Sequence, residues 1–156
     1  MHMEKVMINQ TNGGQEMHSI IQLILEQRVF AVVGASRNIE KYGYKVYKAL
    51  LAAGFTVYPV NPNADEIDGN QVYPTLESVP KQINCVVTVV PPNLTLDIMR
   101  QAGALNIPYV WMQPGSEGET AVMEAETYGM DVVHSGPCIM VAVLTKKNEA
   151  SAESGR

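Results

Sequence analysis

The sequence has little of what metal centres, disulfide scaffolds and membrane anchors are built from. Among 156 residues there are two cysteines, three histidines and one tryptophan. The cysteines and histidines show no CxxC, HxxxH or HExxH spacing, so the sequence predicts no zinc site. No apolar run reaches the length of about 18 residues that a membrane span needs, and residues 1–14 lack a signal-peptide core.

Charge and catalytic motifs are also sparse. The net charge is −5, which argues against general nucleic-acid binding and against an anionic membrane surface. No Ser-His-Asp order, paired carboxylates or Walker A sequence supports hydrolysis or phosphoryl transfer. Cys85 lies inside an apolar strand pattern, which predicts a core residue, no disulfide and a cytoplasmic location. We therefore expect a binding protein without a catalytic group of its own.

Short valine-rich runs alternate with helical patterns along most of the chain. The runs that predict strands are residues 29–33, 55–60, 84–90, 108–112 and 130–133. Residues 139–144 are apolar and fit either a strand or a helix. Alternating strands and helices with short loops predict an α/β fold, a Rossmann-like doubly wound parallel sheet of five to six strands. We expect one domain over residues 18–144, a flexible arm at 1–17 and a frayed tail at 145–156.

Helix ends carry their own signals. Gly54 and Gly129 follow helical patterns and predict C-terminal caps. Two Ser-x-x-Gln/Glu spacings predict capping boxes at helix starts, and these are Ser19 with Gln22 and Ser116 with Glu119. The helix after residue 93 is expected to bury a stripe formed by Leu94, Ile98 and Leu105, with Met99 and Ala102 beside it.

The first predicted strand ends in a turn that suits a phosphate. Residues 34–38 read Gly-Ala-Ser-Arg-Asn and lead into a helix, whose start presents free N–H groups and a positive dipole. The NAD fingerprint needs two further glycines here and an acid after the second strand, where Asn61 stands instead. Both departures argue against NAD and favour another phosphate-bearing ligand.

Basic residues concentrate just after this turn. Residues 37–48 hold four of them against one acid, and they are Arg37, Lys41, Lys45 and Lys48. The alternative is a solvated helix face without a ligand. We keep Arg37 and Lys41, which lie nearest the turn, as phosphate ligands, whereas Ser36 suits either a helix cap or a phosphate.

The ordered motifs resemble those of the single-domain CoA-binding proteins, which are similar to the CoA-binding domain of the succinyl-CoA synthetase alpha subunit. The resemblance runs from about residue 26 to residue 143. The segments that carry it are 33–37, 41–43, 58–62, 90–92 and 138–141. It implies a Rossmann-type domain that binds coenzyme A, and many members have Asp or Asn where this chain has Gly136.

The resemblance also implies a set of binding residues. Those at the phosphates would be Gly34, Ala35, Ser36, Arg37, Lys41 and Tyr42. Those near the adenosine would be Val60, Asn61 and Pro62, with Pro91 and Pro92 along the ligand.

Three further side chains are open to two interpretations. Cys138 is either a thiol that faces the thiol end of CoA or a small buried apolar residue. His134 is a lone histidine near a strand end, and Trp111 fits the core better than a stacking platform. The sequence thus predicts a protein that binds CoA or an acyl-CoA. An NAD(H)-binding sensor and CoA-thiol exchange through Cys138 are the alternatives. The sequence contains no motif that indicates a homodimer, so a homodimer remains possible.

Overall fold

The chain folds around one parallel sheet. The computed structural model describes residue 14 and residues 16–154, so most of the predicted arm at 1–17 lies outside the described residues. The strands of the main sheet are β1 (Val29–Val33), β2 (Thr56–Val60), β5 (Cys85–Thr88), β6 (Tyr109–Met112) and β7 (Asp131–Val133). Their order is β2-β1-β5-β6-β7, and every neighbouring pair is parallel. The predicted α/β sheet is confirmed with five strands.

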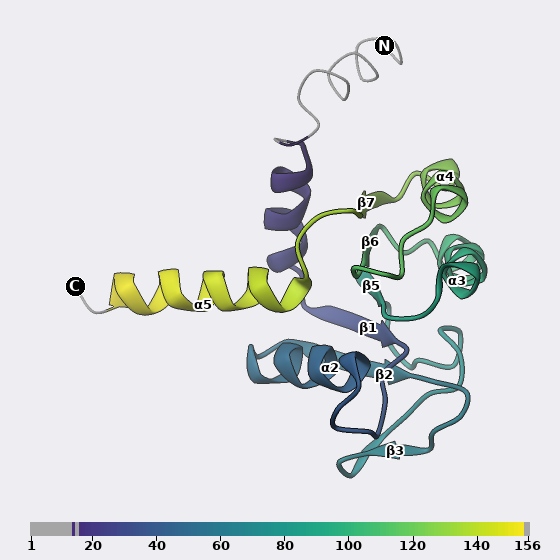
Figure 1. Ribbon diagram of the computed structural model, residues 1–156, viewed down its shortest axis with the longest axis horizontal. Coiled ribbons are helices and arrows are strands. Elements are labelled where there is room, and N and C mark those ends of the chain that lie inside the picture. The colour runs from purple at the N-terminus through teal and green to yellow at the C-terminus, as the bar shows by residue number, and fades with distance from the viewer. Residues whose placement is uncertain (1–13, 15, 155–156) are drawn as a thin grey trace.

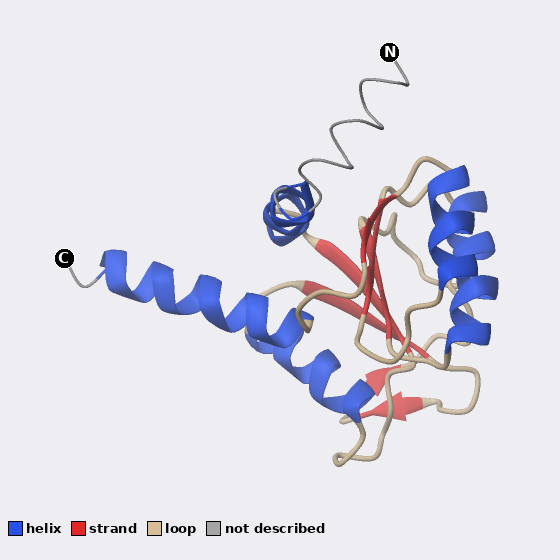
Figure 2. Ribbon diagram, turned by 45° about the horizontal axis from the view of Figure 1, so that its top comes forward, coloured by secondary structure: helices blue, strands red, loops and turns tan. Residues whose placement is uncertain are grey.

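Helices cover both faces of this sheet (Figures 1 and 2). They are α2 (Tyr42–Ala52), α3 (Pro92–Ala104), α4 (Glu119–Thr127), α5 (Ile139–Ser154) and an N-terminal helix over residues 16–25. The N-terminal helix, α2 and α5 pack on one face, and α3 and α4 pack on the other. The alternation within β1 shows why, because Phe30 and Val32 face the first group while Ala31 and Val33 face the second.

Two predicted helix ends are confirmed in detail. Gly54 has φ +93°, and the amides after α2 form the paired bonds of a Schellman cap, Gly54 to Leu51 at 3.0 Å and Phe55 to Leu50 at 3.3 Å. Gly129 has φ +79° and ends α4 with the same pattern. Glycine suits both positions because L-residues avoid this left-handed region.

The predicted capping boxes are wrong. The N-terminal helix already includes residue 16, so it does not begin at Ser19. The residue before α4 is Gly118, and Ser116 is 2% exposed and bonded inside the protein. A serine three residues before a helix start can be drawn into the core when buried hydroxyls lie beside it.

The segment from residue 64 to residue 75 contains a small hairpin, which none of the predicted strands includes. Strands β3 (Glu66–Ile67) and β4 (Asn70–Gln71) pair antiparallel around Asp68 and Gly69, both with positive φ. Asp68 accepts hydrogen bonds from Tyr44 at 2.7 Å and from Lys48 at 2.9 Å, which fastens the hairpin to α2. Lys48 therefore has a structural partner.

Other boundaries also differ from the prediction. The buried side of α3 is formed by Thr95, Met99 and Ala102, whereas Leu94 is 49% exposed. Residues 139–144 open helix α5, which continues to Ser154 through most of the expected tail. Figure 1 shows this helix running away from the sheet toward the C-terminus. Among the described residues, none of the helices is both long and apolar enough to cross a membrane.

Candidate functional site

The carboxyl edge of the sheet is where the predicted site residues gather. In a parallel sheet the turns after all strands reach the same edge, and ligands bind where the strand order reverses. Here that point lies between β1 and β5, since β2 lies on one side of β1 and β5, β6 and β7 lie on the other. The turns after the five strands therefore form one continuous edge.

The turn after β1 is tightly packed and has two glycine requirements. Gly34 has φ +101°, and a Cβ there would lie 2.3 Å from the carbonyl oxygen of Val89. A Cβ on Gly43, in the first turn of α2, would lie 2.0 Å from the carbonyl oxygen of Gly34. Only glycines allow helix α2 to start this close to the end of β1, as nucleotide-binding turns require.

Asn61 joins the turn after β2 to the turn after β1. Its Nδ2 donates a 2.8 Å hydrogen bond to the carbonyl oxygen of Ala35, and its Oδ1 accepts the amide of Asn63 at 2.8 Å. The Gly34 amide donates to the buried Val60 carbonyl at 3.0 Å. The side chain of Asn61 thus holds the edge together, and its contact with an adenosine stays a prediction.

The start of α2 has no side-chain cap. Lys41 occupies the N-cap position. Ser36 does not cap it either, since its Oγ accepts the amide of Asn38 at 3.1 Å. Helices α3 and α4 also begin at this edge without a side-chain cap, after Pro91 and Gly118. Three helix starts without a side-chain cap therefore share one edge, although α3 begins with Pro92, which has no N–H to offer.

The basic residues after the turn divide into two groups. Lys48 is committed to Asp68, whereas Arg37 and Lys41 are exposed and form no ion pair among the residues that the structure describes. Pro62 is exposed in the next turn, as are Pro91 and Pro92, which begin α3. The two cations kept for a phosphate thus have no ion pair in the described part of the chain, and the same is true of the exposed Lys45.

Tyr42, the first residue of α2, contacts the turn that follows β7. Its hydroxyl is hydrogen-bonded to Sγ of Cys138 and lies 3.5 Å from Oε1 of Gln113. Burial is the main cause that raises the pKa of Tyr42, and the contact with Cys138 adds to it. Tyr42, predicted at the phosphates, and Cys138, predicted either at the thiol end of CoA or in the core, are thus in direct contact although they lie 96 residues apart in sequence.

Gln113 was missed by the sequence reading, which took it only as part of a turn. It is fully buried, and Oε1 accepts the amide of Ile139 at 3.0 Å. Its Nε2 has no hydrogen-bond partner among the described residues. The signal was a long amide side chain placed directly after a buried strand at the ligand edge. Trp111 is core as predicted, with Nε1 bonded to the Pro137 carbonyl at 3.0 Å.

The residue that differs from many CoA-binding proteins has a structural explanation. A Cβ on Gly136 would lie 2.8 Å from Sδ of Met17 in the N-terminal helix. An Asp or Asn side chain here would therefore require the flexible end of Met17 to move aside.

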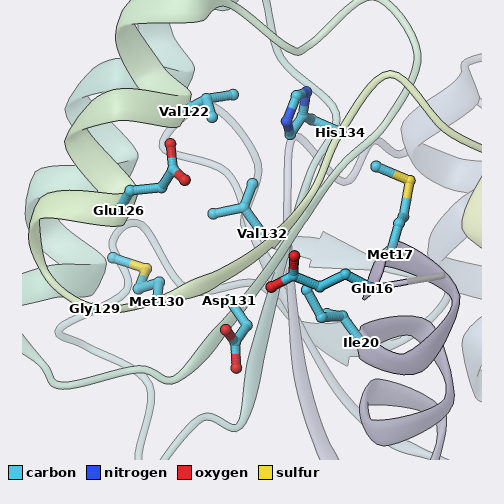
Figure 3. Close-up of a pocket in the computed structure, with 10 residues that line it drawn as sticks. All are labelled: Glu16, Met17, Ile20, Val122, Glu126, Gly129, Met130, Asp131, Val132 and His134. Carbon is cyan, nitrogen blue, oxygen red and sulfur yellow. The ribbon is translucent and has the colours of Figure 1, made fainter. Parts of the chain in front are cut away.

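A separate pocket of about 440 Å³ lies along β7, between the N-terminal helix and α4 (Figure 3). Its lining includes Met17, Ile20, Val122, Glu126, Val132 and His134. None of the twelve residues predicted to bind CoA lines it. His134 contacts Ser135 at 3.2 Å, and no group of three His, Cys, Asp or Glu residues in the described part is placed to hold a metal.

The fold and this edge define a parallel α/β domain whose first strand leads through a glycine turn into a helix without a side-chain cap. Comparison with known proteins gives the class, because the model of the family described as CoA binding domain matches residues 28–143. The chain belongs to this CoA-binding domain family.

Relatives and solved structures fall in the same group. The chain is 28% identical over 140 residues to the alpha subunit of ADP-forming acetate–CoA ligase II from Pyrococcus furiosus, which covers 83% of this chain and 30% of the subunit. It is 27% identical to the uncharacterized protein YneT of Bacillus subtilis, with 82% of this chain and 94% of that protein covered.

A conserved hypothetical protein from Pyrococcus furiosus is similar in structure, with a TM-score of 0.70 and 41% identity. The match covers 74% of this chain and 99% of that one. The chain spans less than a third of the ligase subunit, so that enzyme's reaction does not transfer with the fold.

Proposed function

We propose that the chain binds coenzyme A or an acyl-CoA at the carboxyl edge of the sheet, as a ligand-binding protein without catalysis of its own. The observation that carries the proposal is the turn after β1. There, an uncapped helix start and two unpaired cations, Arg37 and Lys41, surround a backbone that two glycines bring close to the neighbouring strands. Free N–H groups and unpaired cations are what the phosphates of CoA would meet.

The assignment of CoA over NAD(H) is supported by the turn after β2. NAD-type sites use an acid at this position for the ribose hydroxyls. Asn61 stands there, and both its polar atoms are engaged within the protein. A location in a reducing cytoplasm is part of the same proposal and is supported by the two free thiols.

Calorimetry on the reduced protein tests the binding. We expect saturable binding of CoA, weaker binding of dephospho-CoA, and no competition by NADH. Arg37→Ala and Lys41→Ala should each lower the affinity for CoA by roughly tenfold, which is the loss expected for one charged hydrogen bond. Lys81→Ala is the matched control, because this exposed lysine precedes β5 and so lies away from the carboxyl edge. No binding of CoA by the wild type would reject the proposal.

A further inference from the structure

Cys138 differs from Cys85 in its exposure and in the hydrogen bonds that its sulfur accepts. Cys85 is fully buried, and burial raises the pKa of its thiol. Cys138 is half-buried and directly precedes α5. Its sulfur accepts the amide of Met140 at 3.3 Å and is hydrogen-bonded to the hydroxyl of Tyr42. Two donors therefore fix the position of a partly exposed sulfur, and access to the sulfur is one requirement of disulfide exchange.

The second observation is the unpartnered amide beside this pair. The orientation of Gln113 is fixed, because Oε1 must accept the amide of Ile139 and an exchange of the two amide atoms would oppose two donors. Nε2 is then a buried donor without a partner, next to the Tyr42 hydroxyl that contacts Oε1. A buried donor left without a partner costs about 1–3 kcal/mol, which is recovered when an acceptor arrives. The amide carbonyls of a pantetheine arm are acceptors of this kind.

We propose that Cys138 captures the thiol end of CoA as a mixed disulfide, by exchange with a CoA disulfide. This rests on the proposed CoA site, which would hold the nucleotide end at the start of α2. The same helix carries Tyr42 as its first residue, so the sulfur anchor and the phosphate turn meet at one helix start. The pantetheine arm has many rotatable bonds and can bend between them.

The exchange step balances without another oxidant. The Cys138 thiol loses its proton to solvent, and the thiolate attacks one sulfur of the CoA disulfide. A new bond forms between Sγ and that sulfur, and the old sulfur–sulfur bond breaks. Its electron pair leaves with the second CoA as a thiolate, which takes a proton from water. Tyr42 is the positioning residue here, since its hydroxyl holds the sulfur but forms no bond in the reaction.

Intact-protein mass spectrometry with peptide mapping tests the proposal. Reduced protein is incubated with CoA disulfide or with pantethine, which has the same thiol end and lacks the nucleotide. We expect one adduct per chain on Cys138, reversed by dithiothreitol. It should form roughly tenfold or more faster from CoA disulfide, because bound phosphates raise the effective concentration of the disulfide. Cys138→Ser should give no adduct, and Cys85→Ala should give the wild-type adduct.

Two variants separate chemistry on the sulfur from binding. Tyr42→Phe should slow the reaction with both disulfides by the same factor, whereas Arg37→Ala should slow only the reaction with CoA disulfide. An adduct on Cys85, equal rates from the two disulfides, or no adduct would overturn the proposal. Calorimetry with reduced CoA distinguishes a failure of the disulfide capture from a failure of the proposed CoA binding. If CoA binds and Cys138 stays unmodified, only the capture fails, and if CoA does not bind, the proposed function fails.

Discussion

Gly43 lies so close to Gly34 that a Cβ on Gly43 would stand 2.0 Å from the Gly34 carbonyl oxygen. The partner atom is backbone, so a rotamer change cannot relieve the clash. We expect Gly43→Ala to lower the free energy of unfolding by about 3 kcal/mol, the upper end of overpacking penalties. It should also weaken CoA binding, because the start of α2 must move. Urea unfolding and calorimetry measure the two effects.

Gly54→Ala is the control for that variant. Gly54 also has a positive φ, +93°, but nothing lies within 4 Å of an added Cβ. Its substitution should cost about 1 kcal/mol from backbone strain and leave the affinity for CoA unchanged. Equal stability losses in the two variants would contradict the close approach of α2 to β1.

Asn61 offers a test of what holds the edge together. Asn61→Asp keeps the oxygen that accepts the Asn63 amide but removes the donor to the Ala35 carbonyl. We expect a loss of about 1–3 kcal/mol in the free energy of unfolding, together with weaker CoA binding and no gain in NADH binding. Asn63→Asp makes the same chemical change in the same turn and should have a small effect. NADH binding by Asn61→Asp would count against the assigned role of this residue.

Ser116 distinguishes a buried hydroxyl network from a helix cap. Its Oγ donates to Thr88 at 2.8 Å and lies 2.9 Å from Oγ1 of Thr95, so it links β5, α3 and the turn after β6. Ser116→Ala should lower the free energy of unfolding by about 1–3 kcal/mol. Glu119→Ala should have little effect, whereas a capping box would make the two residues comparably important. Urea denaturation of both variants decides between them.

The hairpin β3–β4 should loosen in acid. Hydrogen bonds from Tyr44 and then Lys48 lower the pKa of Asp68 below its ordinary value of 3.8. A carboxyl with a lowered pKa in the folded state stabilises the protein above its unfolded pKa, and this stabilisation disappears as the pH falls through the folded pKa. We therefore expect Asp68→Asn to be less stable than wild type at pH 7, with the difference shrinking below pH 3.8.

A double-mutant cycle with Lys48→Ala tests whether Asp68 stabilises the protein through its ion pair with Lys48. The effect of Asp68→Asn at neutral pH should be smaller in the Lys48→Ala background, because the two residues form one ion pair. The effect is expected to be modest, since exposed ion pairs contribute little. An unchanged effect in that background would place the stabilisation elsewhere.

Much of the fold is readable from the sequence because strong local signals agree with the tertiary structure. The valine-rich run 29–33 and the helix ends at Gly54 and Gly129 depend on neighbours in sequence, and they are confirmed. The hairpin β3–β4 was missed because strands of two residues show no period, although Asp68-Gly69 is itself a strong hairpin signal.

The residues of the candidate site also differ in whether a local motif or a distant partner determines their role. The turn at Gly34 and the cations near it carry local motifs. Ser116 was misread and Gln113 was missed because their roles depend on partners far away in sequence, such as Thr95 and Ile139. A polar residue after a buried strand does not reveal from sequence whether it faces a ligand, a cap or the core.

The starts of α2, α3 and α4 have no side-chain cap, so the proposed binding of an anion at this edge would be linked to the stability of the fold. An anion that binds this edge supplies acceptors that the chain does not provide, so it binds the folded state and not the unfolded chain. By mass action, a ligand at one hundred times its Kd raises the free energy of unfolding by about 2.7 kcal/mol. The melting temperature and the resistance to proteolysis should then rise with the concentration of the proposed ligand.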